Sequence, residues 1–289
     1  MRKFYLFGLP FIIILFIYGF EFLKKGETSP LPINKRGYIL DRNGEPLVIS
    51  MEFYKAYYVL KDKKFFNKIP PEVQKYLPHT INLPKKGLVL LSENLSFDEI
   101  EELKDVKDVV IQKYYKRKVL YPFLTPYLGK SFDNVGIFGI ERHYDEILKK
   151  GESIRLSLDM ELEKRLYFLT KDLKIPYQIM VIHLPTGEIK GFISNFPFKF
   201  YPKDRLLNIA ESIYSKLCKG KGFISPLYQN KEVCDPDFSL ILHNPGWYDF
   251  GDKIYWIKIK DKYLYILSLK KEGEPELIKE LGNSLLAKL

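Results

Sequence analysis

The chain is poor in the residues that bind metals or build disulfide frameworks. It contains two cysteines, Cys218 and Cys234, and four histidines among its 289 residues. The histidines are scattered and none stands at metal-site spacing from another ligand, so we predict no metal and no other cofactor. Two cysteines are a candidate disulfide, which is expected only in an oxidising compartment. No internal repeat is present, and 46% hydrophobic residues suffice for a proper core.

The N-terminus holds a long uncharged apolar run. It is long enough for a helix to cross ~30 Å of hydrocarbon, and no small-x-small cleavage site follows it. We therefore predict an uncleaved signal anchor over residues 4–23, between a cytoplasmic tail at 1–3 and a linker at 24–35. The basic residues before the run favour a cytoplasmic N-terminus. The prediction is a single-pass protein of the cytoplasmic (inner) membrane, with most of the chain periplasmic or otherwise extracytoplasmic.

The charge balance is basic. The chain has 46 lysines and arginines against 36 acidic residues, a formal net charge of +10. Such a balance suits nucleic acid, an anionic membrane surface or an acidic polymer. Because the chain is expected outside the cytoplasm, the lysines have an electrostatic role near anionic lipid. We predict no nucleic-acid partner.

The first half of the chain reads as strands with short helices. Asn43-Gly44 separates two apolar segments and predicts a hairpin, because both residues tolerate the positive φ of a tight turn. Ser96 and Glu99 have capping-box spacing, which predicts a helix over about 97–104. A further helix is expected at 139–151. Strands are expected at FYKAYYVL, GLVLLS and VVIQKYYKRKVLY.

The second half predicts a small sheet packed by helices. Hairpins are expected at 175–194 and 253–271, joined by a segment that reads as irregular from 195 to about 239. A helix over 159–173, near whose N-cap Asp159 lies, and an amphipathic helix over 275–288 are expected to pack on that sheet. The fold class is therefore α+β.

One segment near the N-terminus resembles a family signature. It reads RGYILDRNGEPL and is similar to the R-G-x-I-x-D-R-N-G-x-x-L opening of class B penicillin-binding proteins. These are membrane-anchored peptidoglycan transpeptidases of cell division and elongation, and the signature follows their anchor directly. The matching residues are Arg36, Gly37, Ile39, Asp41, Arg42, Asn43, Gly44 and Leu47.

Later segments keep the order of the same family. GIERHYDEILKKG resembles its G-I-E-R-x-Y-D-x-x-L-x-G segment, and MVIHLPTGEIKGFIS resembles the first hairpin of its transpeptidase domain. KRKVLYPFLTPYLGK matches a third family stretch imperfectly. The G-I-E-R form, together with Ser50, favours the division branch. The matching residues in the two close segments are Gly139, Glu141, Arg142, Tyr144, Gly151, Thr186 and Gly187.

The resemblance implies a domain organisation. Residues 36–152 correspond to the family's pedestal, often called the dimerisation domain, with mixed α/β structure. Residues 153–289 correspond to a reduced transpeptidase-like domain, an antiparallel sheet packed by helices. This second part is much shorter than a family transpeptidase domain.

The family's three catalytic motifs are missing from their places. They are Ser-x-x-Lys at a helix start, Ser-x-Asn, and Lys-Thr-Gly on an edge strand. The literal Ser268 to Lys271 pair lies at the end of a predicted strand, where i and i+3 point to opposite faces. The literal Ser92-Glu93-Asn94 falls in the pedestal. No Lys-Thr-Gly or Lys-Ser-Gly occurs.

Cys218 is the weak candidate for a replacement nucleophile. Setting Asn208 on the family's asparagine brings Cys218 near the catalytic serine and Lys221 near the catalytic lysine. Neighbouring lysines would lower a thiol pKa, whereas the glycines of this segment oppose a helix. Three interpretations stay open: a disulfide between Cys218 and Cys234, an inert free thiol, and a working nucleophile.

These observations give two hypotheses. The first is a non-catalytic, penicillin-binding-protein-like component of peptidoglycan synthesis and cell division. Its anchor and pedestal would act on a SEDS-type membrane glycosyltransferase and on other divisome or elongasome proteins, near the membrane and near peptidoglycan or its precursor. The alternative is an active minimal D,D-transpeptidase-like acyltransferase that uses Cys218 or another nucleophile and binds penicillin.

Overall fold

The computed structural model describes most of the chain after the predicted linker. Within it, no helix is long and apolar enough to span a membrane. The predicted anchor at 4–23 lies outside the described residues. Contacts group Asn34–Leu289 into one compact unit. The described residues are 35–61, 69–77, 86–200, 204–229, 231–237, 247–250, 253–270 and 275–288.

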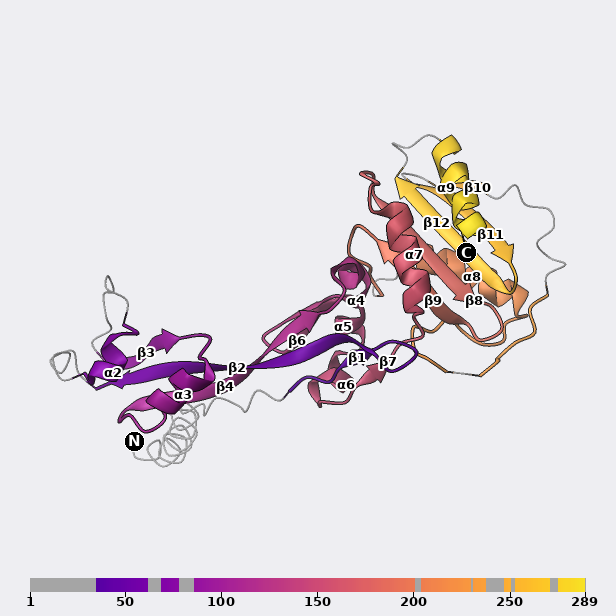
Figure 1. Cartoon of the computed structure of the whole chain (residues 1–289). Coiled ribbons are helices and arrows are strands. Elements are labelled where there is room, and N and C mark those ends of the chain that lie inside the picture. Colours follow the sequence, from indigo (N-terminus) through magenta and orange to yellow (C-terminus); the bar gives the residue numbers. More distant parts are fainter. Residues whose placement is uncertain are drawn as a thin grey trace, which may run out of the picture. The chain divides into compact units, whose positions relative to one another are not determined.

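A first sheet is built around one long strand, β2 (Pro46–Leu60). It pairs antiparallel with β1 (Ile39–Leu40), β3 (Gly87–Ser92) and β4 (Val109–Val119), as Figure 1 shows. The short β7 (Ile154–Arg155) adds to β1 in parallel. The sequence pattern separates PLVIS from FYKAYYVL, but the structure joins the two segments in one strand. The reason is that all of β4, from Val109 to Val119, pairs with β2.

Two helices cover one face of this sheet. The capping box is confirmed: Ser96 accepts a hydrogen bond from the Glu99 backbone, and the Glu99 side chain accepts one in return, so α3 (Phe97–Leu103) begins there. The other helix is α2 (Pro71–Gln74). The core between helices and sheet is formed by Ala56, Tyr58, Leu60, Val73, Val89, Leu91 and Leu103.

A small two-stranded hairpin follows β4 in the sequence. Strands β5 (Lys130–Phe132) and β6 (Val135–Phe138) pair antiparallel through a two-residue turn with positive φ at both positions. The helix predicted over 139–151 is present as two pieces, α5 (Gly139–His143) and α6 (Asp145–Lys149). They are separated at Tyr144, where the backbone leaves helical geometry (φ −109°, ψ 29°). The short η2 (Pro122–Leu124) and α4 (Thr125–Leu128) precede the hairpin.

The predicted antiparallel sheet from two hairpins is confirmed. Its strand order is β10-β11-β12-β8-β9, with every neighbouring pair antiparallel. The edge strand β10 is an addition that the sequence pattern did not predict. The bounds are β8 (Tyr177–His183), β9 (Glu188–Ser194), β10 (Trp247–Phe250), β11 (Lys253–Lys260) and β12 (Tyr263–Lys270).

Helices cover both faces of this second sheet (Figure 1). On one face lie α7 (Met160–Thr170) and α9 (Pro275–Lys288), which pack on strand residues such as Val181 and Leu267. On the other face lies α8 (Arg205–Leu217), which packs on alternate residues of the same strands. Asp159 caps α7 by accepting hydrogen bonds from two backbone N–H groups, as its position in the sequence predicts.

Helix α8 corrects the prediction of an irregular segment from 195 to about 239. Asp204 accepts a hydrogen bond from the Leu206 N–H and starts the helix. Leu206, Ala210 and Tyr214 follow at intervals of four residues and are all buried, which is the spacing of a helix face. The turn-rich residues on either side obscured this periodic signal.

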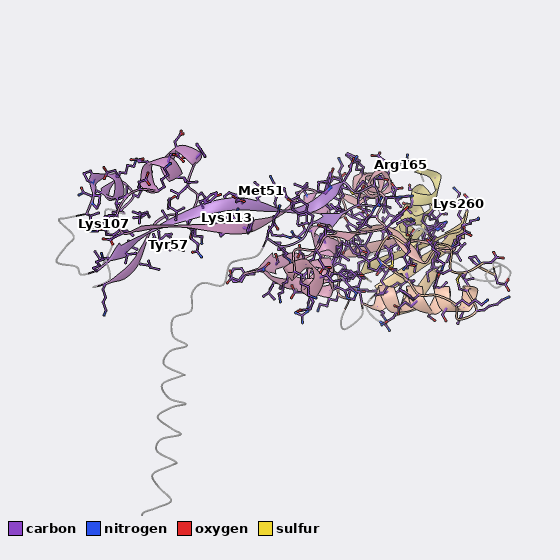
Figure 2. The ribbon with its side chains drawn as sticks, turned by 90° about the horizontal axis from the view of Figure 1, so that it is seen from below. Met51, Tyr57, Lys107, Lys113, Arg165 and Lys260 are labelled. Atoms are coloured by element: carbon purple, nitrogen blue, oxygen red, sulfur yellow. A yellow bond between two sulfur atoms is a disulfide. The ribbon has the colours of Figure 1, made fainter. Side chains whose placement is uncertain are left out.

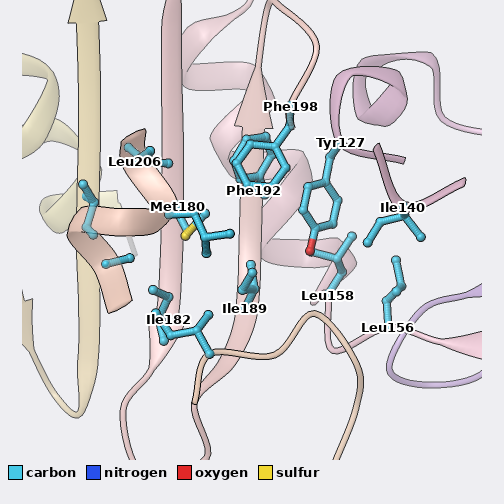
Figure 3. Packing of buried hydrophobic residues seen from close by; sticks show 14 of the residues in the cluster. Tyr127, Ile140, Leu156, Leu158, Met180, Ile182, Ile189, Phe192, Phe198 and Leu206 are labelled. Carbon is cyan, nitrogen blue, oxygen red and sulfur yellow. The ribbon is translucent and has the colours of Figure 1, made fainter. Parts of the chain in front are cut away.

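The largest hydrophobic core links the two predicted domains (Figure 3). Tyr127 stacks on Phe192 with ring centroids 4.7 Å apart, and Phe192 packs on Phe198 at 4.6 Å. The same cluster includes Ile140 from the pedestal side and Met180 from the second sheet. Residues on both sides of the predicted boundary at 152/153 therefore share one core.

Candidate functional site

Arg36 and Glu141, which come from different signature segments, meet with Arg117 in a buried network. Arg36 Nε donates to Glu141 Oε2 at 2.7 Å, and Arg117 Nε donates to Glu141 Oε1 at 2.7 Å. Arg36 also donates from NH2 to the Glu141 backbone carbonyl at 2.8 Å. Arg36 and Glu141 are almost fully buried. One carboxylate thus joins residues that are far apart in the sequence.

Further contacts extend this network to β2 and α6. Arg36 NH1 lies 2.8 Å from Asp145 Oδ1, and that same oxygen accepts a hydrogen bond from the Gly136 N–H. Ser50 Oγ accepts from Arg117 NH1 and donates to the Arg36 carbonyl, both at 2.9 Å. Burial lowers the pKa of Arg117, while the adjacent Glu141 carboxylate opposes that shift. The network is a folding device that fixes β2, β4, α5 and α6 together.

The rest of the first signature forms a turn. Asp41 Oδ1 accepts hydrogen bonds from the Asn43 and Glu45 N–H groups, both at 2.8 Å, and Gly44 completes the turn. Arg42 pairs with Asp159 at 3.1 Å, at the start of α7. Asp41 therefore fixes the backbone of the turn, and Arg42 connects the turn to α7. Both side chains are engaged in structural contacts.

Several signature positions serve close packing around α5. Gly139 has a φ of +66°, and a Cβ there would lie 2.5 Å from the Tyr127 carbonyl, so only glycine fits. Gly37 and Gly151 both donate to the Leu148 carbonyl at the end of α6. Tyr144, at the break between α5 and α6, contacts His143 edge to face. These residues also act in folding.

Cys218 ends helix α8 instead of starting a helix. It is the C-cap of α8 and forms a disulfide with Cys234, with a Cα–Cα distance of 5.5 Å. A helix C-terminus is an unfavourable place for a thiolate, because the helix dipole is negative there. Lys221 is exposed and donates its backbone N–H to the Cys218 carbonyl at 2.9 Å. In this structure Cys218 therefore has no free thiol that could act as a nucleophile beside Lys221.

The two literal motif matches lie in different elements. Ser268 is buried in the middle of the second sheet, on β12 between β11 and β8, and its motif partner lies outside the described residues. Ser92 accepts a hydrogen bond from the Asn94 N–H at the end of β3, in the first sheet. Neither serine is hydrogen-bonded to a lysine in the described part of the chain.

Thr186 and Gly187 lie in the tight turn between β8 and β9. Gly187 has a φ of +69°, and a Cβ there would lie 2.5 Å from the Phe223 carbonyl. Next to it, Glu188 Oε1 accepts the Gln229 N–H at 2.6 Å, while Glu188 Oε2 pairs with the buried Lys190 and accepts from Thr186. The segment after α8 is thereby tied along the edge of β9.

An exposed apolar surface lies on the face of the first sheet opposite α2 and α3. Tyr57 is paired with Leu90 of β3 and with Val110 of β4, and Val59 is paired with Leu88. Directly paired residues share a face, so these five side chains form one patch, here called the outer sheet face. Leu88 is 61% exposed and Val110 is 46% exposed. Met51 and Tyr57 lie along β2 on this face (Figure 2).

Cations and aromatic rings continue the outer sheet face along β2 and β4. Lys55 Nζ lies 4.6 Å from the centre of the Tyr114 ring, and Lys116 Nζ lies 4.9 Å from that of Phe53. An exposed apolar patch bordered by cations is typical of a surface that binds a partner. The sequence pattern did not predict this surface. These strands carry apolar residues on both faces, so the sequence does not reveal which face the helices leave exposed.

Comparisons with known proteins gave matches among solved structures. No protein-family model and no curated protein matches the chain. Among solved structures, the chain is similar to penicillin-binding protein 2 from Helicobacter pylori in complex with MreC, with a TM-score of 0.41 and 16% identity over 79% of this chain. It is also similar to penicillin-binding protein 2X from Streptococcus thermophilus, with a TM-score of 0.40 and 17% identity over 56% of this chain.

The chain is shorter than these proteins. It spans 57% of the Helicobacter protein and 34% of the Streptococcus protein. Penicillin-binding protein 2B from Streptococcus pneumoniae is a further similar structure, with a TM-score of 0.38 and 47% of its length covered.

Proposed function

We propose that this protein is a membrane-anchored, non-catalytic relative of class B penicillin-binding proteins that acts in peptidoglycan synthesis by binding a partner. The observation that supports it most is the burial of the signature. Arg36 and Glu141, each matched by a separate signature segment, meet in one network. These two signature residues thus serve folding, and among the described residues no serine or cysteine thiol is hydrogen-bonded to a lysine as acyl transfer in the family requires.

The outer sheet face supports a role in binding. It is apolar and bordered by Lys55 and Lys116. We propose that it contacts a membrane protein of wall synthesis, a SEDS-type glycosyltransferase or another divisome or elongasome component. The disulfide between Cys218 and Cys234 fits an extracytoplasmic location.

Charged substitutions on the outer sheet face should abolish this partner binding. We expect Leu88→Glu combined with Val110→Glu to reduce recovery of wall-synthesis membrane proteins by at least about tenfold in a pull-down from cross-linked cells, because both carboxylates would lose water at the contact. Phe168→Glu on α7, another exposed apolar site, is the matched control and should leave recovery unchanged. Equal recovery with all three proteins, or recovery of no wall-synthesis protein by the wild type, contradicts the proposal.

A non-catalytic protein should not react with β-lactams. We expect a fluorescent penicillin to leave the purified full-length protein unlabelled, both with its disulfide intact and after mild reduction. The reason is that Cys218 sits at a helix C-terminus without a lysine hydrogen-bonded to its sulfur in the described structure. Labelling that Cys218→Ala removes would instead establish the acyltransferase alternative.

A further inference from the structure

Arg142 differs from the other arginines of the signature segments. Arg36 pairs with two carboxylates and Arg42 with one. The exposed Arg142 has a single long hydrogen bond among the described residues, from NH1 to the Ile137 carbonyl at 3.5 Å. No carboxylate of the described chain lies within ion-pair distance of it. Within the described part of the chain its charge is therefore not neutralised.

Exposed apolar side chains surround Arg142. Phe132 and Val135 are directly paired across β5 and β6, and Val135 and Ile137 alternate along β6, so the three share the outer face of this hairpin. Phe132 is 71% exposed and Ile137 is 49% exposed. Ile147 of α6 is exposed as well. These four side chains with Arg142 are called the hairpin patch.

Two pockets adjoin the hairpin patch, and Arg142 lines both. Val135 and Ile147 contribute to the first pocket, and Ile137 contributes to the second. His143 also lines both pockets and stacks on Phe200 with ring centroids 4.6 Å apart. Two recesses with mixed polar and apolar linings therefore flank a guanidinium that has no carboxylate partner among the described residues.

We propose that the hairpin patch binds an amphipathic segment of a partner protein, whose apolar side chains enter the two pockets and whose carboxylate pairs with Arg142. Charge complementarity identifies the occupant, because a guanidinium among apolar side chains favours a carboxylate over any neutral or basic group. Asp145 and Glu146 line the first pocket, whereas Lys199 joins Arg142 in the second, so the partner's carboxylate is expected on the side of the second pocket.

The backbone of the hairpin disfavours one mode of binding. The Gly136 N–H is already bound to Asp145, and the Asn134 carbonyl to Arg36. Two backbone groups on this side of the hairpin are thus already bonded to the protein's own side chains, which opposes the addition of a partner strand there. Binding through side chains, as for a helix in a groove, is therefore the favoured mode. This site is separate from the outer sheet face and does not depend on the proposed function.

A charge-swap experiment tests the hairpin patch. The probes are two helix-forming peptides of leucine and alanine, one with glutamates on its polar face and one with lysines at the same positions. Fluorescence anisotropy with the full chain in detergent should show roughly tenfold tighter binding of the acidic peptide. Arg142→Glu should reverse this preference, and Ile137→Asp should abolish binding of both. Leu88→Glu, on the outer sheet face, is the matched control and should change neither affinity.

Any of five results would overturn the proposal. The wild type could bind both peptides equally or bind neither. The preference could survive Arg142→Glu, which would place the peptide elsewhere. The full chain could self-associate in light scattering and lose that association in Ile137→Asp, which would assign the patch to a second copy. A fluorophore at position 137 could be quenched by brominated lipid in proteoliposomes, which would assign the patch to the membrane.

Discussion

Glu141→Ala should lower the free energy of unfolding by about 3–5 kcal/mol. Glu141 is buried and accepts hydrogen bonds from Arg36 and Arg117. The alanine would leave the two guanidinium groups inside the protein without the carboxylate that they share. Because both groups stay buried, they regain little hydration to offset this loss. Chemical denaturation of the full chain in detergent, followed by tryptophan fluorescence, measures the change.

Two further variants make this expectation specific. Glu146→Ala removes an exposed carboxylate five residues along the chain and should change stability by less than about 0.5 kcal/mol. Glu141→Gln keeps an oxygen acceptor and should lose less than Glu141→Ala, so it gives a reading even where the alanine protein fails to fold. A loss in Glu141→Ala no larger than that in Glu146→Ala would show that the network does not stabilise the fold.

The same network shows how far the sequence could lead. Arg36 and Glu141 both stand out as members of signature segments, and each can be named from the sequence alone. Their direct contact could not be inferred, because 105 residues separate them and no local rule relates them. Arg117 was noted only as part of an imperfect match, yet it supplies the second guanidinium. The sequence could therefore single out Arg36 and Glu141, but it could not pair them.

Local signals predicted the elements with unequal success. The Ser96–Glu99 capping box and the Asp159 cap depend on neighbouring residues, and both are confirmed. The hairpin at Asn43-Gly44 is present as well, but only Gly44 has a positive φ, so the predicted conformation with positive φ at both positions was wrong. The β5–β6 hairpin turns through Asp133 and Asn134, which both have positive φ. This pair is a turn signal in the sequence, but the apolar residues on either side of it concealed the signal. The exposed surfaces were unpredictable for a different reason. Which face stays open depends on where α2, α3 and α5 pack, and that is decided by tertiary contacts.

Glu163 is a buried acid whose protonation should make stability depend on pH. It lies on α7, and its Oε1 accepts the Phe192 N–H, while its Oε2 has no hydrogen-bond partner in the described part of the chain. Burial raises the pKa of the Glu163 carboxyl well above its usual range, and the Phe192 hydrogen bond offsets only part of this shift. The folded protein therefore holds a proton that the unfolded chain releases above about pH 4.5.

Because the folded state binds the extra proton, stability must fall as pH rises from the unfolded pKa toward the raised folded pKa, by roughly 1.4 kcal/mol per pH unit. Glu163→Gln keeps the acceptor for Phe192 and cannot ionise. We expect it to match the wild type within about 1 kcal/mol near pH 5 and to become increasingly more stable than the wild type as pH rises from there. Glu161→Gln, an exposed change on the same helix, should show no such trend. Taking each variant relative to wild type cancels the titration of other groups. A Glu163→Gln difference that stays constant with pH would mean that the carboxyl is ionised in the fold, with a partner beyond the described residues.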